Sequence, residues 1–249
     1  MPGDTALARA LALVRDLRAR CPWDRVQTRD TLRPYLVEEA LELDQALKQD
    51  DAARLRDELG DLLLHIAFQI VIGEERGEFD AETVTRALED KMRRRHPHLF
   101  GLGDKPLSWE LGKRETGKGK RGILEGIPAK LPPLLMAYRL QERAAGVGFD
   151  WPDATGPMHK VKEEIAEVER ETGHGKRETI EDEIGDLLFA VVNLARKLAI
   201  DPRAALERAN DKFTRRFEAV ERLAEQRGVD LGRAGLADLD RLWDEVKAR

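Results

Sequence analysis

The residues best suited to chemistry in this sequence are carboxylates in a pattern that occurs twice. The first copy pairs Glu38-Glu39-x-x-Glu42 with Glu58-x-x-Asp61, and the second pairs Glu163-Glu164-x-x-Glu167 with Glu183-x-x-Asp186. Corresponding acids are 125 residues apart, and the flanking segments 57–63 (DELGDLL) and 182–188 (DEIGDLL) are nearly identical. Carboxylate oxygens are typical ligands of Mg²⁺ and Mn²⁺, ions that commonly serve phosphate chemistry. The pattern therefore predicts two repeated modules, each with a candidate metal site.

The acids of the second copy occupy equivalent edges of two predicted amphipathic helices. With residues about 100° apart around a helix, Glu164 lies about 60° from the apolar stripe of its helix, and Glu167 about 60° further round. Glu183 and Asp186 have the same relation to the apolar stripe of the next helix. Because the turn between the two helices is short, we expect an antiparallel hairpin in which these four carboxylates converge.

The acid that begins each motif has a different direction. Glu163 lies about 100° from Glu164 and therefore cannot occupy the same position. We expect Glu163 to lie outside the set of metal ligands, where it would either help to position those ligands or act as a base for water. The first copy has the same geometry, with Glu38 outside. Its candidate metal ligands are Glu39, Glu42, Glu58 and Asp61.

The ordinary interpretation of such acids is a solvated helix surface, and an isolated pair three residues apart is usually that. Four acids at the edges of apolar stripes are harder to explain in this way. Like charges repel at short range, and partial burial adds a desolvation penalty unless a cation is present. The repetition of the whole set favours the metal site further.

Basic and aromatic residues follow each acidic set. Lys212 and Arg216 are one helical turn apart after the second set, and Trp243 and Lys247 have the same spacing near the C-terminus. Cations bind phosphate oxygens that a metal ion does not hold, and a tryptophan can stack on a base. An exposed charged pair and a packing tryptophan are the alternatives. The weaker counterparts after the first set are Lys91, Arg95, Trp109 and Lys113.

The histidines do not form a metal set. His96 and His98 flank a proline, and His65 lies on the helix that carries Asp61. We interpret all three histidines as structural or exposed.

The composition is that of a helix-rich soluble protein, with 37% charged and only 5% aromatic residues. A formal net charge of −5 gives no global bias toward nucleic acid, and no stable nucleic-acid binding is expected. The single cysteine, Cys21, cannot form an internal disulfide and fits a reducing cytoplasm. No apolar run approaches the roughly 20 residues that cross a membrane, so no membrane partner is expected.

Helices are predicted over most of the chain, and strands nowhere. Apolar periodicity and capping residues predict helices over about 5–19, 30–48, 52–76, 80–95, 157–172, 177–199, 202–227 and 236–248, with one more beginning at Pro132. The fold class is therefore all-α, with two tandem helical-bundle modules related by an internal repeat. Residues 1–100 form the N-terminal module, 101–131 a flexible linker and 132–249 the C-terminal module.

Further motifs surround the acidic sets. Those of the first half are Cys21-Pro22-Trp23-Asp24, Gln27-Thr28 and Arg94-Arg95-His96-Pro97-His98. Those of the second half are Val147-Gly148-Phe149-Asp150-Trp151, Asn193-Leu194-Ala195-Arg196 and Asp211-Lys212-Phe213-x-x-Arg216-Phe217. With these motifs in order over nearly its whole length, the chain resembles the MazG family of nucleoside triphosphate pyrophosphohydrolases. The acidic motif alone is shared with the wider all-α pyrophosphatase superfamily, which includes dimeric dUTPases.

The resemblance implies an all-α homodimer that cleaves nucleoside triphosphates between the α and β phosphates, with Mg²⁺ as cofactor; Mn²⁺ is the alternative that the carboxylate ligands allow. The main catalytic site would lie in the C-terminal module. Its metal ligands would be Glu164, Glu167, Glu183 and Asp186, with Glu163 assisting the water. The nucleotide would be bound by Lys160, Lys212, Arg216, Trp243 and Lys247, with Lys176 and Arg177 as further candidates. We expect in-line attack of an activated water on the α-phosphorus.

Two other classes of protein remain open. Di-iron carboxylate proteins also use paired acids in helical bundles, but they normally have Glu-x-x-His, and no histidine follows a key acid at that spacing. A non-catalytic helical interaction protein would leave the acids solvated. The sequence has no P-loop motif GxxxxGK[ST], and it does not reveal a base preference.

Overall fold

The computed structural model describes residues 5–49, 51–101 and 122–248. These residues form helices and contain no strand, and the chain separates into two compact units, 1–106 and 107–249. The prediction of an all-α fold with tandem modules is confirmed. Most of the predicted linker, together with Trp109 and Lys113, lies outside the described residues. None of the described helices is both long enough and apolar enough to cross a membrane.

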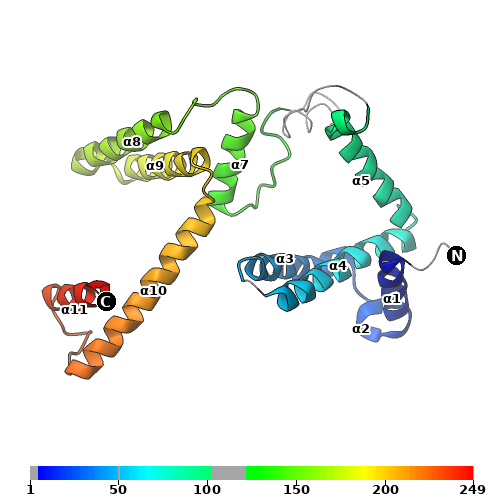
Figure 1. The fold of residues 1–249 in the computed structure, drawn as a ribbon, viewed down its shortest axis with the longest axis horizontal. Helices are drawn as coiled ribbons and strands as arrows, with labels where there is room; N and C mark the ends of the chain where they lie inside the picture. Colours follow the sequence, from blue (N-terminus) through cyan, green and yellow to red (C-terminus); the bar gives the residue numbers. More distant parts are fainter. Residues whose placement is uncertain (1–4, 50, 102–121, 249) are drawn as a thin grey trace. The chain divides into compact units, whose positions relative to one another are not determined.

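The first unit is built on a two-helix hairpin. Its elements are α1 (Ala6–Arg20), α2 (Pro22–Arg25), α3 (Arg29–Ala46), α4 (Ala52–Glu75), α5 (Ala81–Arg95) and the 3₁₀ helix η1 (Pro97–Leu99). The hairpin consists of α3 and α4, and α1 packs against α4 (Figure 1). Leu11 and Val14 of α1 and Leu32 of α3 pack against the apolar second half of α4. This core leaves the first half of α4, which carries the acids, outside it.

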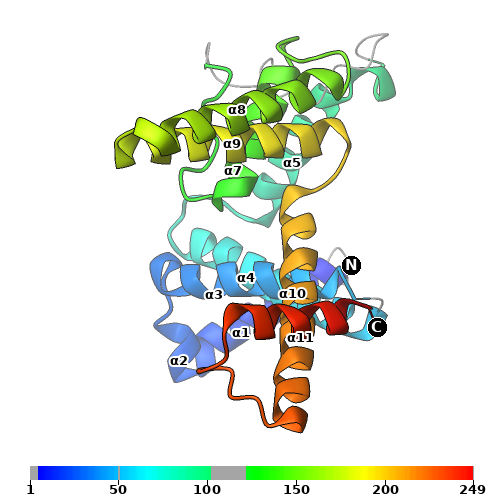
Figure 2. The same cartoon turned by 90° about the vertical axis from the view of Figure 1, so that its left-hand side faces the viewer.

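The second unit repeats the hairpin and adds a long arm. Its elements are α7 (Pro133–Ala145), α8 (Thr155–His174), α9 (Arg177–Lys197), α10 (Pro202–Arg227) and α11 (Leu236–Ala248). The hairpin consists of α8 and α9, with α7 against α9. Figures 1 and 2 show α10 leaving the end of α9 as a long helix, with α11 packed on its far half. That far half has a core of its own, formed by Val220, Leu223, Ala224 and Leu242.

Capping residues fix several helix starts at the positions that the sequence predicts. The Asp51 carboxylate accepts hydrogen bonds from the backbone N–H groups of the first turn of α4. Asp201 does the same for α10, with Pro202 at the first helical position. Such caps satisfy backbone donors that have no partner within the helix. Gly228 ends α10 with a φ of 65°, a conformation that glycine adopts without strain.

The structure differs from the predicted helices in two places. No helix was predicted between residues 19 and 30, but residues 22–25 form the short helix α2, in which the backbone N–H of Arg25 donates a hydrogen bond to the backbone oxygen of Cys21. Pro22 favours this because its fixed φ suits a first helical position. The helix predicted over 177–199 ends at Lys197, because Ala199 adopts a φ of 56° that interrupts helical geometry.

Candidate active site

The second acidic set lies on the two arms of the α8–α9 hairpin. Oxygens of Glu164 on α8 and of Glu183 and Asp186 on α9 lie within 4.8 Å of one another. Oxygens of Glu163, Glu164 and Glu167 form a second such group on α8. The structure therefore brings all five predicted acids together, with Glu164 common to both groups.

Glu164 is the buried centre of this set. Its exposed fraction is only 3%, and its Oε2 atom has no hydrogen-bond partner among the described residues. An unpartnered buried carboxylate oxygen is costly, because neither water nor a protein donor stabilises its charge. A divalent cation would supply that missing partner. The all-oxygen donor set fits Mg²⁺ or Mn²⁺.

Lys160 contacts the same carboxylates. Its Nζ atom lies 2.6 Å from Glu164 Oε1 and 2.8 Å from Glu163 Oε1. These hydrogen bonds, to Glu163 first and then to Glu164, raise the pKa of the Lys160 ammonium. Lys160 was predicted to line the nucleotide site, and the structure places it among the acids as a fixed positive charge.

Crowding of like charges is visible at Glu167. A hydrogen bond with Glu164, the loss of hydration, and the charges of Glu164 and Glu183 raise its pKa above the ordinary value of 4.5. The carboxyl thus holds a proton more strongly than a free glutamate side chain does. Positive charge at this position would reverse the effect.

The first acidic set is also assembled, on α3 and α4. Oxygens of Glu39, Glu58 and Asp61 lie within 4.8 Å of one another, and this group does not include Glu42. Burial and the charges of Asp61 and Glu42 raise the pKa of Glu39. Arg54 lies 3.5 Å from Glu58, so this set has a cation of its own.

His65, which was interpreted only as structural or exposed, lies beside the first acidic set. Its exposed fraction is 7%, and its Nε2 atom lies 3.8 Å from Glu39 Oε1. The ring stacks on Tyr35, and burial lowers its pKa. The available signal was the helical spacing of Asp61 and His65, together with the alanine at the corresponding position of the second copy, Ala190.

His96 and the two loop candidates, Lys176 and Arg177, lie at the ends of helices. His96 Nδ1 lies 3.0 Å from the backbone oxygen of Met92, at the end of α5. Arg177, at the start of α9, is exposed and pairs with Glu181 at 3.2 Å. Lys176 is the N-cap residue of the same helix.

The predicted phosphate-binding residues lie on the long arm. We call Lys212 and Arg216 of α10, with Trp243 and Lys247 of α11, the arm set. Lys212 and Lys247 are exposed. Lys212, Arg216 and Lys247 make no ion pair with any residue that the structure describes. Trp243 packs against Phe213, with ring centroids 5.4 Å apart.

An apolar hollow adjoins the arm set. It has a volume of about 280 Å³, and it is lined by Phe213, Phe217, Val220, Leu231, Leu239, Asp240 and Trp243. Aromatic walls of this kind suit a flat ring system such as a base. The arm set therefore places three cations beside an aromatic surface.

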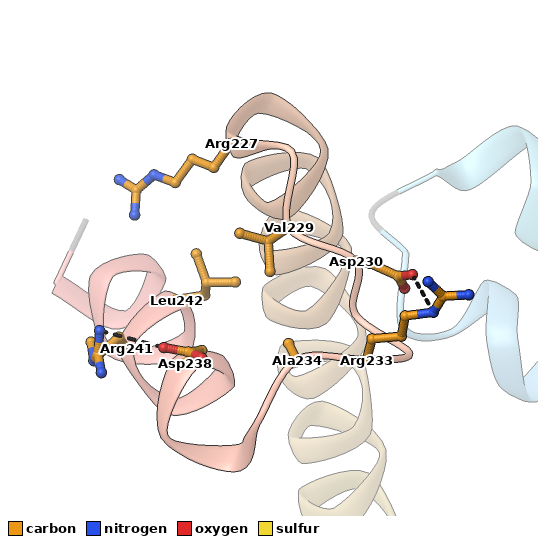
Figure 3. Close-up of a pocket in the computed structure, with 8 residues that line it drawn as sticks. All are labelled: Arg227, Val229, Asp230, Arg233, Ala234, Asp238, Arg241 and Leu242. Carbon is orange, nitrogen blue, oxygen red and sulfur yellow. Dashed lines mark ion pairs between the residues drawn. The ribbon is translucent and has the colours of Figure 1, made fainter.

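A larger hollow, of about 500 Å³, lies where α10 turns into α11 (Figure 3). Its arginines point in different directions, as Figure 3 shows. Arg233 pairs with Asp230, and Arg241 with Asp238, both at 3.4 Å. These arginines do not converge on one ligand, so the hollow is not a candidate anion site.

The structure does not bring the arm set to the acids within one chain. In Figures 1 and 2, α11 and the far half of α10 lie away from the α8–α9 hairpin. The first unit shows a similar separation, because Lys91 and Arg95 lie on α5, which leaves the opposite end of α4 from the acids (Figure 1).

Comparison with known proteins gives consistent matches. The sequence matches the family described as MazG nucleotide pyrophosphohydrolase domain at residues 27–100 and again at 155–221. It is 43% identical over 232 residues to the Thermotoga maritima protein named nucleoside triphosphate pyrophosphohydrolase/pyrophosphatase MazG, covering 91% of this chain and 89% of that one. It is 41% identical over 244 residues to the nucleoside triphosphate pyrophosphohydrolase of Escherichia coli K12, covering 94% and 93%.

Proposed function

Since the chain belongs to the MazG nucleotide pyrophosphohydrolase family, we propose that it hydrolyses nucleoside triphosphates to nucleoside monophosphates and pyrophosphate. The alignments with the relatives that carry this name cover about nine tenths of this chain and about nine tenths of each relative. This coverage supports the same activity for this chain. The observation that carries the proposal is the pair of carboxylate groups that share Glu164, a buried residue whose Oε2 atom has no partner among the described residues.

Mg²⁺ is the proposed cofactor, with Mn²⁺ as the alternative. Glu164, Glu167, Glu183 and Asp186 would hold it. Oxygens of Glu164, Glu183 and Asp186 lie within 4.8 Å of one another, Glu167 joins Glu164 in the second group, and Glu164 Oε2 lacks a partner. When bound, the ion supplies charge neutralisation for the triphosphate and makes a nearby water more acidic. The C-terminal unit is the main catalytic unit in this proposal.

Glu163 is the proposed acceptor of the water's proton. Its side chain is more than half exposed, so it is open to solvent beside the cluster. Lys160 holds it at 2.8 Å and thereby fixes its direction. A general base must be held in place and must reach the water whose proton it accepts. Glu163 meets both conditions, because it is held by Lys160 and exposed to solvent.

The arm set is the proposed binding surface for the nucleotide. Lys212, Arg216 and Lys247 would bind phosphate oxygens through charge-assisted hydrogen bonds. Trp243, in the wall of the apolar hollow, would stack on the base.

We also propose a homodimer in the cytoplasm, where Cys21 would remain reduced. Each hairpin presents an exposed apolar stripe at equivalent positions: Leu59, Leu63 and Ile66 on α4, and Ile184, Leu188 and Val191 on α9. Pairing hairpins from two copies would bury these stripes in a four-helix arrangement. Light scattering at micromolar concentration tests this, and a monomer would contradict it.

The product of the reaction is the decisive test of the activity. A panel of nucleoside triphosphates is incubated with the protein and Mg²⁺, and pyrophosphate is separated from orthophosphate. We expect pyrophosphate and monophosphate in equal amounts. Release of orthophosphate with a nucleoside diphosphate would disprove the proposed position of attack.

A further inference from the structure

We propose that the first acidic set binds a late first-row divalent metal ion, with the imidazole of His65 as a ligand beside the carboxylates of Glu39, Glu58 and Asp61. Suitable ions are those that accept both imidazole and carboxylate ligands, such as Co²⁺ and Zn²⁺. The second set consists of carboxylates, so the two units would select different metals. The proposal does not depend on the proposed hydrolysis, because it concerns ion binding by the first unit.

His65 lies on the helix that also supplies two of the carboxylates. It follows Asp61 by four residues on α4, and residues with this spacing lie on the same side of a helix. Its Nε2 atom lies 3.8 Å from Glu39 Oε1 on α3. The imidazole is therefore directed at an oxygen of the first acidic set.

The distances suit ligands of one ion. Two ligand atoms that are each about 2.1 Å from an ion lie between about 3.0 and 4.2 Å apart, depending on the angle between them. The 3.8 Å between His65 Nε2 and Glu39 Oε1 falls within that range. Oxygens of Glu39, Glu58 and Asp61 lie within 4.8 Å of one another, so small side-chain shifts would bring them to the same ion.

The imidazole of His65 is buried without a hydrogen bond. The residue is only 7% exposed, and its Nδ1 atom has no partner among the described residues. The 3.8 Å from Nε2 to Glu39 exceeds the length of a hydrogen bond. Buried polar groups are normally paired, and an ion bound at Nε2 would satisfy one of the two nitrogens. Stacking on Tyr35, with ring centroids 6.5 Å apart, helps to hold the ring in this orientation.

The two copies of the repeat differ at the residues beside the central glutamate. In the second copy Lys160 Nζ lies 2.6 Å from Glu164, and the corresponding residue of the first copy is Tyr35. Glu39 therefore lacks the ammonium group that neutralises Glu164. His65 lies beside Glu39 instead, at the position where the second copy has an alanine. The first set thus has a metal-binding group where the second has a fixed cation.

Metal binding by the full-length protein tests the proposal. Metal is removed with EDTA, the chelator is removed, and Co²⁺ or Mg²⁺ is titrated by calorimetry, with Glu183→Gln present in every protein to weaken the second set. His65→Ala introduces the residue of the second copy. It should weaken Co²⁺ binding by at least about tenfold, because losing even a residue that only supports a ligand costs about 10–100-fold. Mg²⁺ binding should change by less than about twofold, since Mg²⁺ prefers oxygen ligands.

Two further variants separate ligation from packing. His98→Ala removes an exposed histidine of η1 and should leave Co²⁺ binding unchanged. His65→Leu fills the buried space without a ligand atom, and it replaces His65→Ala if that variant does not fold. It should show the same selective loss of Co²⁺ binding. Equal weakening of Co²⁺ and Mg²⁺ binding in the His65 variants would show a packing role only and would overturn the proposal.

The position of the ion gives a readout that needs no variant. Crystals of the wild-type protein grown with Co²⁺ are measured on both sides of the cobalt absorption edge. The anomalous peak should lie about 2.1 Å from His65 Nε2 and bind at least one carboxylate of the first set. A peak held by carboxylates alone, or a peak at the second set without one at the first, would overturn the proposal. Neither result depends on which phosphate product the enzyme releases, so failure of the proposed function is distinguishable.

Discussion

At the scale of single residues, Glu164 is where the charge of the second acidic set is least compensated. Lys160 neutralises one of its oxygens, and the other oxygen is buried without a partner. Because a cation would stabilise that oxygen most, Glu164 should dominate the response of the protein to Mg²⁺.

Glu164→Gln should therefore remove most of the increase in melting temperature that Mg²⁺ produces. It should also lower kcat by about 10²–10³, because a preorganised group at the reacting charge is lost. Thermal unfolding with and without Mg²⁺, and steady-state kinetics, are the measurements. Glu169→Gln, an exposed position on the same helix, is the control. An unchanged Mg²⁺ shift in the Glu164 variant would exclude this residue as a ligand.

The raised pKa of Glu167 predicts how the stability of the metal-free protein changes with pH. Its folded pKa is raised above the ordinary 4.5, so the folded state keeps this proton while the unfolded state releases it. The stability contributed by the proton is present below the unfolded pKa and is lost as pH rises through the folded pKa.

Unfolding in EDTA across this pH window should show wild type losing stability from about pH 4.5 upward, and Glu167→Gln should lose less. With Mg²⁺ the order should reverse, since the ion competes with the proton for the same carboxylate. Parallel curves for the two proteins in EDTA would show that the crowding of charges has no effect on stability.

The sequence largely predicted which face of its own helix each acid occupies. It predicted less well which residues of two neighbouring helices contact each other. Spacing of about 100° per residue placed Glu164, Glu167, Glu183 and Asp186 on facing edges, and the structure brings them together. The contact between His65 and Glu39 depends on how α3 and α4 pack, which no local pattern specifies.

At the scale of elements, capping residues and turns determine where the helices that carry the candidate site residues begin. Asp201 accepts hydrogen bonds from the backbone N–H groups of Arg203 and Ala204, at 2.8 and 3.2 Å, and so starts the helix that carries Lys212 and Arg216. The helix predicted over 202–227 begins at this position. The sequence did not predict the direction of α10, which depends on contacts with α7 and α9.

Asp201→Ala should lower stability by about 1 kcal/mol, or roughly 2–4 °C in melting temperature, because the first turn of α10 loses its cap. Chemical and thermal unfolding measure this. Glu221→Ala, an exposed position on the same helix, should change stability by less than about 0.5 kcal/mol. Equal effects of the two substitutions would mean that the cap contributes little to stability.

At the scale of the whole molecule, the internal repeat predicted two modules, and both acidic sets are assembled. The repeat did not predict how the two sets differ. The second set has a buried carboxylate oxygen without a partner, whereas the first contains Arg54 beside Glu58 and the buried His65 beside Glu39. These neighbours are visible only after packing is known.

These differences favour the second set as the main catalytic site. Both sets contain a cation, Lys160 in the second and Arg54 in the first. A buried carboxylate oxygen without a partner, which a divalent cation would stabilise, occurs among the described residues in the second set and not in the first set. The counterpart cations of the first set, Lys91 and Arg95, lie on α5, and the structure does not describe Trp109 and Lys113. The second set is followed by a complete and described arm set.

We therefore expect Glu183→Gln to abolish most turnover and Glu58→Gln to leave much of it. Each preorganised group aimed at the developing charge is worth on the order of 10²-fold in rate, so the loss should be concentrated in the unit that has the complete set. The measurement is kcat at saturating Mg²⁺ and nucleotide, with dimer formation checked for both variants. If Glu58→Gln is the more damaging change in a well-folded dimer, the first acidic set is the main catalytic site.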